Sequence, residues 1–158
     1  MKLGIDLGGS HVGMGLISED LKLIQTQHID FQKKEKIQLE EIQEMIRQTI
    51  HKMLAEQNLT KEEISQIGVA APGVPKEDRI ERIVNLRFEN LSVSELLPDF
   101  QGKKISIHND GKCAAVAEKK MGSLIDEKDC IFLCLGTGIG AGVFLDGNLL
   151  KPRKSTRI

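Results

Sequence analysis

Two glycine-rich turns, each between apolar strand-like segments, are the parts of this sequence best suited to chemistry. Gly8, Gly9 and Ser10 follow the apolar residues 3–7, and Gly136, Thr137 and Gly138 follow the apolar residues 130–135. Glycine lets a ligand approach the main-chain N–H groups closely, so such a turn can bind an anion in a nest of amides. The Ser and Thr side chains add hydroxyl donors. Each turn is therefore a candidate phosphate cradle.

The second turn opens a segment, from Gly136 to Ala141, that fits the GxGxxA pattern of dinucleotide-binding folds. That pattern requires a helix after the turn, whereas residues 141–145 are strand-like and end at the hairpin dipeptide Asp146, Gly147. We therefore exclude a Rossmann fold and expect two antiparallel strands, with Gly140 as part of the cradle. The likeness of the two turns indicates either two equivalent cradles or a chance echo in a chain with 15 glycines.

Polar side chains follow two of the strand-like segments. Asp6 stands beside the first glycine turn, where a carboxylate repels phosphate unless a cation lies between them. Asp6 is therefore a candidate Mg²⁺ ligand, directly or through water, with capping of the turn as the alternative. Asn109 and Asp110 follow the strand 104–108 and open a helix, where either residue is also an ordinary N-cap. His11, after the first turn, is of a type that more often packs or hydrogen-bonds than binds a ligand.

Composition excludes several classes of function. Lys and Arg total 22 against 23 Asp and Glu, so a formal net charge of −1 provides no positive field to hold nucleic acid or an anionic membrane. Aromatic residues make up 3%, without Trp or Tyr, which disfavours both single-strand binding and a membrane belt. The N-terminus has no apolar run of the signal-peptide kind, so we expect a cytoplasmic chain without membrane segments. The three cysteines form no CxxC pair, and we expect reduced thiols and no zinc site.

Hydrophobic periodicity predicts the elements that position these motifs. Residues 39–54 carry apolar side chains at helical spacing, and Ser92 with Glu95 forms a capping box for a second helix. The nearly all-apolar segment 130–135 is typical of a strand covered on both faces. The predicted strands are residues 3–7, 11–17, 21–31, 67–71, 104–108, 130–135 and 143–145, and the predicted helices are 39–54, 93–97 and 111–121.

Five segments together resemble the N-terminal half of a sugar kinase of the ROK family, of the bacterial glucokinase type. They are GIDLGGSHVGMGLI (residues 4–17), GVAAPG (68–73), VNL (84–86), HNDGKCAAVAE (108–118) and LGTGIGAGVFLDGNLL (135–150). The resemblance implies an α/β fold of the actin-like ATPase (ribonuclease H-like) class, in which each of two lobes has a mixed five-stranded sheet with flanking helices. We expect residues 1–150 to form the first lobe, residues 151–158 to be a basic, poorly ordered tail, and the second lobe to be absent.

The resemblance also implies roles for single residues. Asp110 would be the general base that accepts the proton of a hexose hydroxyl as it attacks the γ-phosphate of Mg-ATP. Gly73, Asn85 and Asn109 would line the sugar site. The residues implied to hold ATP phosphates are Asp6, Gly8, Gly9, Ser10, His11, Gly136, Thr137, Gly138 and Gly140, with Asp6 toward Mg²⁺.

Two departures from the family qualify these expectations. His11 stands where the family commonly has Lys or Asn, and the ExGH sugar-binding element and zinc cluster that follow in the family are not present. We expect the chain alone to have little kinase activity, and its uncovered apolar surface to favour a homodimer. The alternatives are a non-catalytic sugar- or phosphate-binding module and a fragment of a sugar-responsive ROK regulator.

Overall fold

The computed structural model of the chain describes residues 1–31, 37–73, 75–76, 78–83, 86–135 and 139–150. These residues form two compact units, Met1–Asn109 and Asp110 onward. The expectation that residues 1–150 are one lobe stays a prediction, and the structure adds a division inside that range. Asn85, Gly136, Thr137, Gly138 and the expected tail 151–158 lie outside the described residues.

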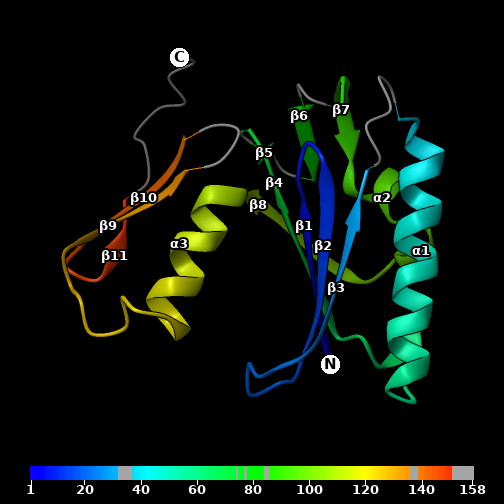
Figure 1. The fold of residues 1–158 in the computed structure, drawn as a ribbon, viewed down its shortest axis with the longest axis horizontal. Helices are drawn as coiled ribbons and strands as arrows, with labels where there is room; N and C mark the ends of the chain where they lie inside the picture. Colours follow the sequence, from blue (N-terminus) through cyan, green and yellow to red (C-terminus); the bar gives the residue numbers. More distant parts are fainter. Residues whose placement is uncertain (32–36, 74, 77, 84–85, 136–138, 151–158) are drawn as a thin grey trace. The chain divides into compact units, whose positions relative to one another are not determined.

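The first unit is built on a mixed five-stranded sheet, as the sequence predicts. Its strand order is β3-β2-β1-β4-β8. Strand β2 pairs antiparallel with both β1 and β3, whereas β4 pairs parallel with both β1 and β8 (Figure 1). The bounds are β1 (Lys2–Leu7), β2 (His11–Ile17), β3 (Leu23–Asp30), β4 (Gln66–Ala71) and β8 (Lys104–Asn109).

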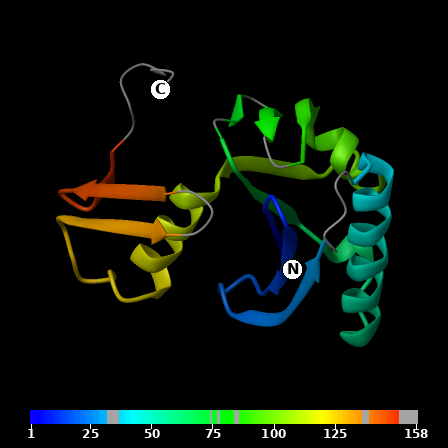
Figure 2. The same cartoon turned by 45° about the horizontal axis from the view of Figure 1, so that its top comes forward.

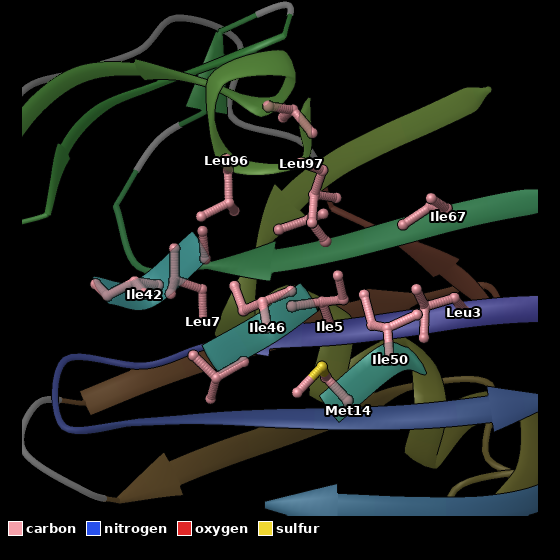
Figure 3. Close-up of a cluster of buried hydrophobic side chains, with 14 of the residues drawn as sticks. Leu3, Ile5, Leu7, Met14, Ile42, Ile46, Ile50, Ile67, Leu96 and Leu97 are labelled. Atoms are coloured by element: carbon pink, nitrogen blue, oxygen red, sulfur yellow. The ribbon is translucent and has the colours of Figure 1, made fainter. Parts of the chain in front are cut away.

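One face of this sheet is covered by the predicted amphipathic helix, α1 (Leu39–Glu56). The helix begins at a capping box in which the Gln38 main-chain N–H donates to the Glu41 carboxylate at 3.0 Å. Ile42, Ile46 and Ile50 recur every four residues and lie against the alternate side chains of β1 (Figure 3). Burial of each such side chain contributes about 1.5–3 kcal/mol, so this contact fixes which face of the sheet is the core.

A small second sheet in the first unit was not predicted from the sequence. It consists of β5 (Pro75–Lys76), β6 (Arg79–Ile83) and β7 (Phe88–Ser92), in the order β5-β6-β7. The predicted capping box at Ser92 and Glu95 is confirmed and opens α2 (Val93–Leu96). Two short 3₁₀ turns, η1 (Lys61–Glu63) and η2 (Pro98–Phe100), complete the unit.

The second unit packs one helix on a three-stranded sheet. It contains α3 (Asp110–Met121), β9 (Cys130–Leu135), β10 (Ile139–Leu145) and β11 (Asn148–Leu149). Figure 2 shows α3 alongside the β9 and β10 pair. The predicted hairpin at Asp146 and Gly147 is confirmed, because both residues have positive φ and lie between the paired Leu145 and Asn148.

The expectation that both faces of β9 are covered is wrong. Ile131, Leu133 and Leu135 alternate on the face away from α3 and are 63%, 59% and 76% exposed. The reason is that α3 covers only the face bearing Phe132, with Gly142 allowing the helix to approach Ala115 closely. An apolar run in the sequence shows that both faces of a strand can be buried. Here the described residues cover one face of β9 and leave the other exposed.

Glu19 links the start of β1 to the start of β4. Its carboxylate accepts the N-terminal ammonium at 2.9 Å and the Ser65 hydroxyl at 2.8 Å. The ammonium, followed by Ser65, lowers the pKa of Glu19 from 4.5 to about 2.

Among the described residues, no helix combines the length and apolar character needed to cross a bilayer.

Replacing this carboxylate should change how stability depends on pH. Because the pKa of Glu19 is lower in the folded state, its contribution is complete above pH 4.5 and is lost as pH falls toward 2. Glu19→Gln should lower the melting temperature at pH 7 by no more than a few degrees, since the carboxylate is exposed. Thermal melts from pH 7 to pH 2 should show that the difference from wild type shrinks below pH 4.5. A difference that is constant over that range would contradict the assignment.

Candidate functional site

The first glycine turn has the geometry of a tight hairpin loop. Leu7 pairs with Val12, and the Gly8 N–H donates to the His11 carbonyl at 2.9 Å. A Cβ on Gly8 would lie 2.9 Å from Cε1 of the His11 ring, so the ring rests directly on the glycine. Ser10 is exposed, and its carbonyl accepts the Phe31 N–H at 2.8 Å. The absence of a side chain at Gly8 is thus required for packing of the His11 ring, and it can also serve ligand binding.

Asp6 lies on the sheet face opposite the core. It pairs with Gly13 on β2 and with Ala70 on β4, so small residues flank its carboxylate. The side chain is 57% exposed, and its Oδ2 lies 4.0 Å from Nε2 of His11. Within the described ranges, no group of three or more His, Cys, Asp or Glu side chains is arranged to hold a metal ion. Mg²⁺ commonly takes one carboxylate together with water and phosphate oxygens, and an exposed single Asp fits that kind of binding.

The ends of β4 and β8 are joined by a hydrogen bond. The Asn109 side-chain Nδ2 donates to the Gly73 carbonyl at 2.9 Å. Gly73 has a φ of +88°, and a Cβ there would lie 3.2 Å from the Arg82 carbonyl oxygen. Asn109 therefore holds a turn that only glycine adopts without strain.

Four of the predicted site residues gather at one edge of the five-stranded sheet. Strands β1, β4 and β8 are parallel, so their carboxyl ends meet at the same edge, which is where α/β sheets bind ligands. That edge carries Asp6, Gly8, Gly73 and Asn109, and Gly9, Ser10 and His11 continue from the same hairpin. The predicted phosphate and sugar residues of the first unit that the structure describes are thereby brought together.

Asp110 and Gly140 belong to the second unit. Asp110 is the first residue of α3, and its Oδ1 accepts the Gly111 N–H at 2.7 Å. An N-cap side chain would instead accept from a residue two or three positions further on, so this contact tests neither the capping role nor the catalytic role, and both stay predictions. Gly140 faces α3, since a Cβ on it would lie 3.2 Å from the Gly111 Cα. The structure thus gives Gly140 a packing role, and its contact with phosphate also stays a prediction.

Two residues on β3, His28 and Asp30, lie on the same sheet face as Asp6 and His11, and they were not identified from the sequence. The His28 ring centroid lies 4.7 Å from that of His11, and His28 Nε2 lies 2.9 Å from Asp30 Oδ1. The signal was present in the alternation of residues 23–30, which places both side chains on the same face as Asp6 and His11.

Comparison with known proteins bears out the resemblance. Residues 2–155 match the family model described as the ROK family. The chain belongs to the ROK family. It is 32% identical over 152 residues to the beta-glucoside kinase of Listeria innocua and 31% identical over 157 residues to the glucokinase of Thermotoga maritima. These matches cover 92% and 96% of this ROK chain but 47% and 46% of the two kinases, so the chain spans about half their length.

Solved structures confirm the fold class. A ROK family glucokinase from Streptomyces griseus, solved with glucose and AMPPNP, superposes with a TM-score of 0.75 at 21% identity. The superposition covers 96% of this chain and 46% of that structure. At that identity the likeness establishes the fold alone, which is the expected actin-like ATPase fold. The regulator alternative is not better supported: the xylose repressor of Caldicellulosiruptor bescii also matches, at 24% identity, which is below the 32% and 31% of the two kinases.

The turn at Gly73 should be measurably intolerant of a side chain. Gly73 and Gly102 both have positive φ, +88° and +84°, but a Cβ on Gly102 meets nothing within 4 Å. Gly102→Ala should therefore cost only the left-handed backbone, about 1 kcal/mol, whereas Gly73→Ala should cost roughly 2 kcal/mol or more. Urea unfolding of the two variants measures the difference. Equal losses would show that the Arg82 carbonyl moves aside without cost.

Proposed function

We propose that this ROK chain carries part of the machinery of an ATP-dependent sugar kinase, which transfers the γ-phosphoryl group of ATP to a hexose hydroxyl. The observation that carries the proposal is the gathering of Asp6, Gly8, Gly73 and Asn109 at the carboxyl edge of the sheet. Family membership and the kinase names of the relatives support the same activity. ATP and Mg²⁺ are the cofactors that this reaction needs.

The residues divide into a phosphate group and a sugar group. The Gly9 main-chain N–H and the Ser10 hydroxyl would donate to phosphate oxygens beside Gly8, whose own N–H is bonded to the His11 carbonyl. Asp6 would bind the Mg²⁺ that neutralises those oxygens. Gly136, Thr137, Gly138 and Gly140 are proposed for the same phosphates from the second hairpin. Mg-ATP when bound supplies the phosphoryl group and charge neutralisation, and the protein supplies positioning.

The sugar group is proposed to orient and deprotonate the attacking hydroxyl. Gly73, Asn85 and Asn109 would fix the hexose, and the Asp110 carboxylate would accept the hydroxyl proton as the oxygen bonds to phosphorus and ADP leaves. The hydrogen bond from Asn109 to Gly73 supports this arrangement, because it keeps two proposed sugar contacts next to each other.

We also propose a cytoplasmic location. Cys113, Cys130 and Cys134 are free thiols in the structure.

Asp110 can be tested in a chimera, because the relatives are about twice the length of the match. Residues 1–155 would replace the matched part of the Thermotoga maritima glucokinase, and a coupled ATP-consumption assay would survey common hexoses. Asp110→Asn should lower kcat by about 10²-fold or more with little change in KM, because it removes the proton acceptor and keeps the shape. Asp126→Asn, an exposed acid of the same unit, is the control and should have no effect.

The alternatives give different results in the same assay. An unchanged kcat in the Asp110→Asn chimera would contradict the role of Asp110 as the base. A folded chimera that binds hexose but turns over none would favour the non-catalytic binding module.

We further propose that two copies of the chain associate through the outer face of the β9 and β10 pair. Register places Ile131, Leu133 and Leu135 on the same face as Ile139 and Val143, and no charged side chain interrupts them. Ile139 is 80% exposed and Leu135 76%. Contiguous apolar surface of this kind marks an interface, and an uncharged face can pair with itself without like-charge repulsion.

Light scattering at tens of micromolar should therefore give about twice the monomer mass of 17.5 kDa. Leu133→Asp should return the chain to the monomer mass, since a buried unpaired charge opposes association. Leu23→Asp, at a position of β3 that is 63% exposed, should leave the dimer intact. A monomer mass for the wild-type chain would rule out the proposed dimer.

A further inference from the structure

The His11 ring is in contact with three residues at the first glycine turn. Its ring rests on Gly8, its Nε2 faces the Asp6 carboxylate at 4.0 Å, and its Nδ1 lies 3.4 Å from the Ser10 hydroxyl. The side chain is 36% exposed, so an edge of the ring reaches solvent beside the main-chain donors of the turn. An imidazole in this place can offer an N–H donor to the same anion as the turn.

Register explains how a second histidine reaches this ring. His28 on β3 pairs with Gly13 on β2, and His11 pairs with Asp30. The two histidines are therefore diagonal neighbours, a separation that aromatic rings can bridge. The His28 ring lies 4.7 Å from the His11 ring, centroid to centroid, and a Cβ on Gly13 would meet only the Asp6 Cβ, at 3.6 Å.

Asp30 fixes the orientation of His28. An ionised carboxylate only accepts hydrogen bonds, so His28 Nε2 donates to Asp30 Oδ1 across the 2.9 Å between them. Both residues lie on one face of one strand, two positions apart, and no rearrangement of the backbone is needed. The order of contacts runs from Asp30 to His28, then to His11, and ends at Gly8.

We propose that His28 and Asp30 are positioning residues that hold the His11 ring at the glycine turn, where it contacts the phosphate oxygens of a nucleoside triphosphate. This inference rests on the proposed function, because it takes the turn to be a phosphate cradle. It adds β3 to the site, with His28 and Asp30 acting through His11 and touching no ligand themselves. The contact depends on the placement of the ring and on a single N–H donor.

The test is a binding measurement on the full chain with Mg-AMPPNP as the probe. Calorimetry should show that His11→Ala and His28→Ala each raise Kd by roughly threefold to tenfold, the range expected for loss of one aromatic contact. His28→Phe keeps a ring and should lose less affinity than His28→Ala. His51→Ala, an exposed histidine of α1, is the control and should match wild type.

A double-mutant cycle separates positioning from direct contact. If His28 acts through His11, then His28→Ala added to His11→Ala should have no further effect on Kd. NMR of the His11 ring gives a second readout: its C–H resonances should shift with Mg-AMPPNP in wild type and not in His28→Ala, while melting temperatures stay similar.

Each outcome bears on a different claim. Binding by wild type with an unchanged Kd in His28→Ala overturns the positioning role and leaves the phosphate cradle standing. Additive losses in the double variant would overturn it too, since they would mean that His28 contacts the nucleotide directly. Absence of binding by wild type removes the cradle in this chain and the inference with it, and the chimera assay then reports on the kinase proposal separately.

Discussion

The packing of α1 on one face of the five-stranded sheet is the contact on which the rest of the first unit depends. Ile42, Ile46 and Ile50 of the helix pack against Leu3, Ile5 and Leu7, the alternate side chains of β1, which are almost fully buried (Figure 3). Because a strand sends successive side chains to opposite faces, the same contact sends Gly4 and Asp6 to the other face. A shift of register by one residue would bury the carboxylate and expose the core, so the stability of the unit and the position of Asp6 are specified together.

A second constraint is the direction of the strands. The parallel course of β1, β4 and β8 brings residues that are distant in sequence to one edge, where β1 and β4 each lead into a turn and β8 leads into α3. The turns differ in what holds them. The first rests on the His11 ring over Gly8, and the second rests on the Asn109 hydrogen bond to Gly73. Side chains that are candidates for binding thus also stabilise the loops. A substitution at one of them changes structure and binding together, so a matched control variant is needed to separate the two effects.

Sequence reasoning succeeded where a local signal had a single interpretation. Short apolar runs and alternation predicted the five strands of the first sheet, and helical spacing predicted α1. Local motifs also predicted the helix start at Ser92 and the hairpin turn at Asp146. It failed on β6, where the buried Ile80 and Ile83 are three residues apart and do not alternate, and on the turn before β7, where Arg87 takes a positive φ that its type does not suggest. It also missed His28 and Asp30, because their importance comes from the strand beside them: only the register with β2 shows that His28 is a diagonal neighbour of His11.

The junction between the two units falls between two of the proposed functional residues. Asn109 ends β8 and bonds to Gly73, within the first unit, whereas Asp110 begins α3, within the second. The orientation of α3 is in turn set by how closely it approaches β10 at Gly140 and Gly142. Consecutive residues of the chain therefore take their positions from separate cores. Substitutions at the α3 and β10 contact therefore act first on the helix that begins with Asp110, whereas substitutions at Gly73 act first on the hydrogen bond of Asn109.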